Sequence, residues 1–285
     1  MYTTYWNLRA SPFLNADSET FLYPSEQLQE GVARLFYLID QERIAGMVTG
    51  PYGVGKTFLL SCLVRRTQKL KVPLIRFDAI PNGGLPMARH ILRQIGVEDD
   101  APTLADALMR LQQHCMDGSR GLARHVLLLD EAQYLAEGDG LYLVHFLCNL
   151  RIRSADGEKP LFTTVLSGTP ALARSVDGYE SLRRRIQLAW TLDPLSREQT
   201  IEYVQQHVRA AGGDIWAFSR EALDAVHRYS GGIPRSINNL CDTALMLGYA
   251  AGAHAVTPDI VGEAAVDTGL APRTPAAAPI QDPAT

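Results

Sequence analysis

The feature that most constrains this chain is a glycine-rich loop that lies between an apolar run and a helical segment. The loop is Gly50-Pro51-Tyr52-Gly53-Val54-Gly55-Lys56-Thr57, and Phe58 follows it at the start of the helical segment. It matches the pattern GxxxxGK[ST], in which glycines let backbone N–H groups turn toward phosphate oxygens at a helix N-terminus. The pattern requires a strand before it and a helix after it, and both are expected here. We therefore predict a nucleotide site with contacts from residues 50–58.

Two side chains of this loop have separate predicted roles toward ATP. Lys56 is expected to reach the β- and γ-phosphates, and the Thr57 hydroxyl is expected to ligate Mg²⁺. The alternative is a glycine turn that only happens to precede a Lys-Thr pair. The completeness of the motif and its position along the chain favour the phosphate site.

An acidic pair ends the most apolar run of the chain. Residues 126–129 are Val-Leu-Leu-Leu, and Asp130 and Glu131 follow them directly. A carboxylate at the end of a buried strand is costly without a cation, and a magnesium site supplies one. We predict that Asp130 holds the metal and that Glu131 orients and polarises the attacking water. An exposed acidic pair is the alternative. With Glu131 in this role the chain is an ATPase rather than a nucleotide binder.

A short polar segment, Ser167-Gly168-Thr169, follows the fourth predicted strand. Thr169 is predicted to touch the γ-phosphate or the lytic water, and Ser167 is the second choice for this role. A plain polar turn before Pro170 is an equal alternative.

Arginines provide two further candidates for the reaction. Arg183, Arg184 and Arg185 lead into the fifth predicted strand, and an arginine from a neighbouring subunit can stabilise charge on the transferring phosphoryl group. Arg185 is our candidate because it adjoins the strand; a solvated helix end is the alternative. Arg235 follows Gly231-Gly232-Ile233-Pro234, which ends one helix and begins another, and we predict that it points from a second domain toward the nucleotide.

The order of apolar segments predicts an α/β doubly wound parallel sheet followed by a helical domain. Strands are expected at residues 44–49, 72–77, 125–129, 161–166 and 186–192. Helices are expected at residues 25–43, from 58, at 85–95, 103–116 and 139–153, and then at 196–211, 219–229, 233–250 and 257–266. The predicted domains are 1–193 (nucleotide-binding), 194–267 (helical lid) and 268–285 (a Pro/Ala-rich disordered tail).

Composition excludes several other classes of protein. Hydrophobic residues make up 46% of the chain, and no apolar run approaches the roughly 20 residues that span a bilayer. The N-terminus lacks the features of a secretory signal, so we expect a cytoplasmic protein without membrane insertion. The four cysteines form no CxxC pair, which disfavours a zinc site. The net charge of −4 indicates no overall basic surface, although a local DNA-binding face remains compatible with it.

Taken together, these motifs resemble those of AAA+ ATPases, specifically the bacterial branch of ExeA/GspA-type secretion ATPases. The resemblance covers about residues 1–267. Besides the motifs above, the matching segments are Tyr5-Trp6, Ser11-Pro12-Phe13, Asp130-Glu131-Ala132-Gln133, Leu182–Ile186, Pro194–Glu198 and Gly232–Arg235.

The resemblance implies a five-stranded parallel P-loop domain with a helical lid, sensor 1 near Thr169, an arginine finger near Arg185 and sensor 2 at Arg235. It also implies a homo-oligomer, a ring or a filament, in which Arg185 acts across the subunit interface. Two departures stand out. Residues 167–169 are Ser-Gly-Thr where secretion members more often have Gly-Gln-Pro, and the membrane and peptidoglycan-binding regions of longer members have no counterpart. The TnsC/TniB-type transposition regulators have a similar core.

Three functions therefore stay open at this point. The first is an oligomeric Mg²⁺-ATPase that assembles or remodels an unidentified client complex, as in secretion or pilus systems. The second is an ATP-dependent DNA-binding regulator that recruits a transposase. The third, a small-molecule P-loop kinase, is disfavoured by the Asp130-Glu131 pair and by the helical C-terminal domain.

Overall fold

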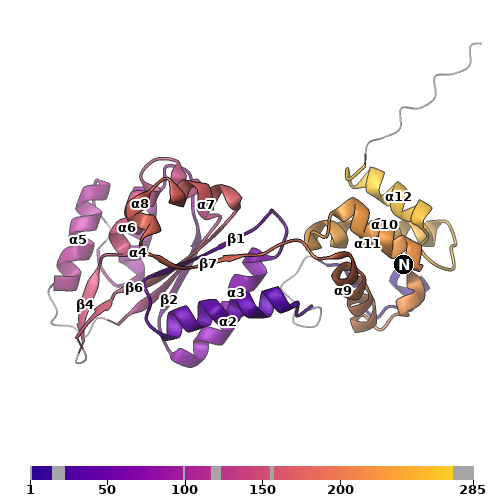
Figure 1. The fold of residues 1–285 in the computed structure, drawn as a ribbon, viewed down its shortest axis with the longest axis horizontal. Helices are drawn as coiled ribbons and strands as arrows, with labels where there is room; N and C mark the ends of the chain where they lie inside the picture. Colours follow the sequence, from indigo (N-terminus) through magenta and orange to yellow (C-terminus); the bar gives the residue numbers. More distant parts are fainter. Residues whose placement is uncertain (1, 15–22, 99, 117–122, 155–156, 272–285) are drawn as a thin grey trace, which may run out of the picture. The chain divides into compact units, whose positions relative to one another are not determined.

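The computed structural model describes residues 2–14, 23–98, 100–116, 123–154 and 157–271. They group into two units, which are drawn in Figure 1. One unit is Pro24–Asp193, and the other combines Met1–Tyr23 with Pro194–Thr285.

The first unit is built on a parallel sheet of five strands, which confirms the predicted fold class. The spatial order of its strands is β2-β3-β6-β1-β7. The central strands are buried along their whole length because helices cover both faces, whereas exposure alternates along the edge strand β7. The strands are β1 (Ala45–Thr49), β2 (Leu74–Asp78), β3 (His125–Asp130), β6 (Phe162–Gly168) and β7 (Ile186–Thr191).

Two layers of helices bury the faces of this sheet (Figure 1). The helices α2 (Glu26–Asp40) and α3 (Lys56–Thr67) cover one face, and Ser25, the N-cap of α2, accepts a hydrogen bond from Leu28 N at 3.3 Å. The other face packs against α4 (Gly84–Gln94), α5 (Leu104–Met116), α6 (Gly140–Leu147), α7 (Pro170–Asp177) and α8 (Glu180–Arg183).

The strand register brings the polar motifs to one edge of the sheet. Thr49 at the end of β1 pairs with Gly168 of β6, and Asp78 of β2 pairs with Asp130 of β3. Because all five strands are parallel, the loops that follow them meet at the carboxyl edge, where ligands bind in open α/β sheets. The phosphate loop, the acidic pair and the Ser-Gly-Thr segment therefore lie together.

One predicted helix, residues 139–153, is wrong in its second half. The helix α6 ends at Leu147, and β4 (Arg151–Ser154) pairs antiparallel with β5 (Gly157–Pro160). Leu150 and Ile152 are both buried in the same core as α6. Apolar residues at these two positions are compatible with a helix and with a strand, so the spacing of apolar residues alone does not distinguish the two structures.

The second unit contains four main helices around its own apolar core. They are α9 (Arg197–Ala210), α10 (Arg220–Ser230), α11 (Pro234–Ala250) and α12 (Pro258–Asp267). Ser196 and Gln199 form a capping box at the start of α9. Thr257 is the N-cap of α12 and accepts a hydrogen bond from Ile260 N at 3.5 Å, and Pro258 is the first helical residue.

The N-terminal segment differs from its predicted place in the nucleotide-binding domain. It clusters with the helical unit and begins with the short helix α1 (Tyr2–Tyr5). Trp6 and Phe13 are buried in the core of that unit, and Trp6 Nε1 donates to Leu245 O at 2.9 Å. Sequence order alone had assigned this segment to the nucleotide-binding domain, because the partners of Trp6 and Phe13 lie more than 190 residues further along the chain.

At the other end, Leu270 and Ala271 pack against the helical core, and the rest of the predicted disordered tail, 272–285, lies outside the described residues. None of the helices in the described ranges is long and apolar enough to cross a membrane.

His207 of α9 is expected to make the helical unit sensitive to acid. Its ring stacks on Phe13 and on Tyr203, and burial lowers its pKa from 6.5 to about 4. The unfolded chain therefore binds a proton that the folded unit excludes, so stability is full above pH 6.5 and falls as the pH drops toward 4. At about 1.4 kcal/mol per pKa unit, the loss at pH 4 is about 3 kcal/mol.

Urea unfolding at pH 7 and pH 4.5 measures this effect. We expect His207→Gln to reduce the difference in unfolding free energy between the two pH values, while the exposed His254→Gln leaves it unchanged. An equal pH dependence in both variants would contradict a titrating His207.

Candidate nucleotide site

The phosphate loop leaves β1 and turns directly into α3. Gly53 and Gly55 adopt positive φ angles of 78° and 109°, which L-residues rarely adopt. Gly50 is equally constrained, because a Cβ there would lie 2.4 Å from the Leu192 carbonyl oxygen. The first N–H groups of α3 have no acceptor within the helix and lie at the positive end of its dipole. The loop therefore has the conformation and the donors of an anion cradle.

Lys56 is held over this loop. Its side chain is buried, and Nζ donates to the carbonyl oxygens of Gly50 at 2.9 Å and Pro51 at 3.0 Å. Nζ also lies 5.7 Å from the ring centroid of Tyr52, whose side chain is 59% exposed. A buried ammonium is stable only with partners of this kind, and it places a positive charge where the phosphates of a nucleotide would bind.

Asp130 is the centre of a hydrogen-bond network at the carboxyl edge of the sheet. The residue is 2% exposed, and its Oδ2 accepts from Thr57 Oγ1 at 2.8 Å. Its Oδ1 accepts from Ser167 Oγ at 2.7 Å and from Glu131 N at 3.0 Å. The carboxylate thus joins the ends of β3 and β6 to the first turn of α3.

The oxygen ligands that Thr57 and Asp130 offer fit Mg²⁺. The Thr57 hydroxyl and the Asp130 carboxylate are hard oxygen ligands, and Mg²⁺ typically binds through one or two carboxylates together with substrate phosphates and water. When bound there, the cation would neutralise charge on the phosphate oxygens. Thr57 and Asp130 are in contact with each other, and their shared role toward Mg²⁺ stays a prediction.

Glu131 follows Asp130 in the left-handed conformation, with φ at 48°. This conformation is uncommon for a residue with a side chain and is concentrated at functional sites. It also ends β3 and begins a short 3₁₀ helix, Ala132–Ala136. Glu131 Oε2 accepts a hydrogen bond from Gln133 Nε2 at 2.6 Å.

The two candidates for sensor 1 occupy different places. Ser167, fully buried, bonds directly to Asp130. Thr169 is the N-cap residue before α7, and its backbone N–H donates to Gln133 Oε1 at 3.1 Å. Both therefore belong to the site, and which of them meets the γ-phosphate stays a prediction. Gln133 itself carried no predicted role; its only signal in the sequence was its place next to the acidic pair.

The three arginines before β7 differ in their surroundings. Arg183 pairs with Asp177 at 3.3 Å, and Arg184 pairs with Glu180. Arg185, half-buried, has no ion pair with any carboxylate of the described residues. Burial is the larger cause that lowers the pKa of His145 and of Arg151, and the positive charge of Arg185 is the second cause. Arg185 thus lies in a cationic environment.

Arg235 belongs to the helical unit, whereas the candidate residues described above belong to the first unit. It lies in the first turn of α11 and its side chain is exposed. Its predicted contact with the nucleotide stays a prediction.

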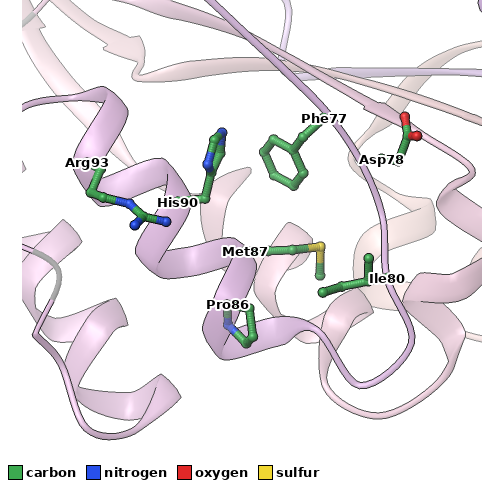
Figure 2. Close-up of a pocket in the computed structure, with 7 residues that line it drawn as sticks. All are labelled: Phe77, Asp78, Ile80, Pro86, Met87, His90 and Arg93. Carbon is green, nitrogen blue, oxygen red and sulfur yellow. The ribbon is translucent and has the colours of Figure 1, made fainter.

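A separate hollow of about 240 Å³ lies beside β2 and α4, lined by Phe77, Met87 and His90 among others (Figure 2). None of the predicted site residues lines it.

Comparison with known proteins agrees with this geometry. Residues 39–176 match the family model described as an AAA domain. General secretion pathway protein A of Aeromonas hydrophila is 31% identical over 275 residues, which are 94% of this chain and 48% of that protein. The chain therefore spans about half the length of this curated relative.

Solved structures share the fold at lower identity. A structure of Drosophila ORC bound to DNA has a TM-score of 0.68 and 17% identity, covering 91% of this chain and 64% of that one. The Aeropyrum pernix ORC1 protein in complex with DNA has a TM-score of 0.64 and 14% identity, covering 92% and 69%. With its parallel sheet and its phosphate loop, the chain has the AAA+ P-loop fold, and its sequence is similar to that of General secretion pathway protein A.

Proposed function

We propose that this protein binds and hydrolyses Mg²⁺-ATP. The network around Asp130 carries the proposal, because it joins the candidate metal ligand Thr57, the candidate γ-phosphate sensor Ser167 and the backbone of Glu131 in one buried cluster. Lys56 and the loop N–H groups bind the phosphates. Glu131, adjacent to the candidate metal ligands, orients and polarises the attacking water. Together these groups provide the positioning and the charge stabilisation on which phosphoryl transfer depends.

We propose further that the site is completed by a second copy of the chain. Ile186 pairs with Ala45 at the start of β1, whereas the phosphate loop follows Thr49 at its end. At roughly 3.3 Å per residue, about 13 Å of strand separates these levels, so Arg185 lies at the amino edge, away from its own phosphate loop. The absence of a carboxylate partner in the described residues leaves its charge available to the nucleotide of a neighbour.

The work done by such an oligomer is the assembly or remodelling of a partner complex. The name of the relative, General secretion pathway protein A, supports a secretion-type or pilus-type system. Because the chain spans about half of that protein, the client is part of the proposal.

The second candidate is an ATP-dependent DNA-binding regulator of transposition. It is kept because two of the solved structures that share the fold are complexes with DNA. The two candidates share the ATP chemistry and differ in their response to DNA.

Substitution of the two central catalytic groups separates binding from hydrolysis. We expect Lys56→Ala to weaken nucleotide binding, because it removes the cation that faces the phosphates. Glu131→Gln should bind ATP normally and lower kcat by at least about 100-fold. A fluorescent ATP analogue measures binding and phosphate release measures turnover. Wild-type turnover by Glu131→Gln would remove that residue from the reaction.

Arg185→Ala is expected to bind ATP but hydrolyse it about 1,000-fold more slowly, the scale known for arginine fingers. Arg184→Ala is the matched control, since Arg184 is exposed and paired with Glu180 of its own helix. Mixing the Arg185→Ala and Lys56→Ala proteins should restore part of the activity. In mixed oligomers, a Lys56→Ala subunit supplies its intact Arg185 to the intact phosphate loop of an Arg185→Ala subunit. Mixtures without any restored turnover would indicate that Arg185 does not act in trans.

Duplex DNA distinguishes the two biological roles. For the remodelling ATPase we expect turnover and oligomer size to be unchanged by duplex DNA at low salt. Stimulation that disappears as salt is raised would instead favour the DNA-binding regulator, because phosphate contacts weaken steeply with salt. Light scattering and phosphate release in the same titration report both quantities.

A further inference from the structure

We propose that Gln133 is the positioning residue for Glu131, and that it couples this carboxylate to the phosphate loop and to the end of β6. The proposal rests on the proposed ATPase activity. Gln133 itself does not enter the chemistry. Its carboxamide holds the side chain that activates water.

The carboxamide of Gln133 contacts three separate segments of the site. Nε2 donates to Glu131 Oε2 at 2.6 Å and to the Tyr52 hydroxyl of the phosphate loop at 3.3 Å. Oε1 accepts from the backbone N–H of Thr169, where β6 passes into α7, at 3.1 Å. A single side chain thereby joins residues that are 81, 2 and 36 positions away in sequence.

The chemistry of these partners sets the orientation of the amide. A backbone N–H can only donate, so the oxygen of Gln133 must face Thr169. An ionised carboxylate can only accept, so the nitrogen must face Glu131. The reversed amide would lose both hydrogen bonds and place oxygen against oxygen. Any movement of Thr169 therefore acts through one rigid, planar group on Glu131.

The surrounding backbone is shaped to admit this side chain. Glu131 turns in the left-handed conformation, and the 3₁₀ helix that follows buries Ala132 and Leu135, which leaves Gln133 directed at the site. Gly168 provides the room, because a Cβ at that position would lie 2.8 Å from Gln133 Oε1. The left-handed turn at Glu131 and the absence of a side chain at Gly168 thus serve the same contact.

The consequence is a link between the γ-phosphate end of the site and the catalytic carboxylate. Thr169 and Ser167 lie at the end of β6, where a γ-phosphate would be sensed, and Tyr52 lies on the phosphate loop. When these segments move, Gln133 transmits the displacement to Glu131. Misplacing a catalytic group by about 1 Å can cost about 100-fold in rate, so this link is sufficient to control turnover.

The experiment replaces Gln133 with methionine, which has a similar length and cannot make these hydrogen bonds. We expect Gln133→Met to lower kcat by about 10- to 100-fold, with KM and the affinity for the ATP analogue unchanged. The control is Gln112→Met, because Gln112 is exposed on α5. Thermal unfolding of each variant shows whether the site alone is affected.

A double-mutant cycle separates positioning from a general structural role. If Gln133 acts through Glu131, Gln133→Met should cause no further loss of residual single-turnover hydrolysis in a Glu131→Gln background. Independent, multiplying losses would overturn the proposal, as would an unchanged kcat in Gln133→Met. If the wild-type protein itself shows no hydrolysis while it binds ATP, the proposed function fails and the positioning role fails with it. An active wild type with an unaffected Gln133→Met overturns the positioning role alone.

Discussion

The buried carboxylate of Asp130 is the interaction on which the rest of the site depends. Within the sheet it is 2% exposed, where an ionised group is tolerated only with full hydrogen bonding. Thr57, Ser167 and the backbone N–H of Glu131 provide that bonding. Because these partners come from α3, β6 and the end of β3, hydrogen bonding to this one carboxylate also aligns the three segments that form the candidate nucleotide site.

The parts of this site that are local in sequence could be predicted. The phosphate loop is one continuous segment, and the spacing of its glycines and of Lys56 predicts their roles. The strands were recognisable because central strands of a parallel sheet are apolar on both faces. The alternation of strands and helices then predicted that β1, β3 and β6 run parallel to one another. Parallel strands bring Asp130 and Ser167 to the same carboxyl edge of the sheet.

Features that depend on distant partners could not be predicted. Trp6 and Phe13 are apolar residues in an irregular segment, and nothing near them indicates that they pack against α9 and α11. Ile152 satisfies either a helix or a strand, so the β4–β5 pair was missed. Gln133 is the most informative case. Its position beside the acidic pair was visible, but its contacts with Tyr52 and Thr169 exist only because the sheet brings those loops together.

The separation of Arg185 from its own phosphate loop has a further consequence for assembly. If the arginine of one subunit meets the nucleotide of the next, the contact joins the amino edge of one sheet to the carboxyl edge of another. Such an interface is heterologous, since two different surfaces meet, and repeating it gives a ring when the rotation closes and a filament when it does not. ATP would then lie within the interface. Gln133, which joins Glu131 to the phosphate loop and to the end of β6, would then make hydrolysis at each site depend on how the neighbouring subunit packs against it.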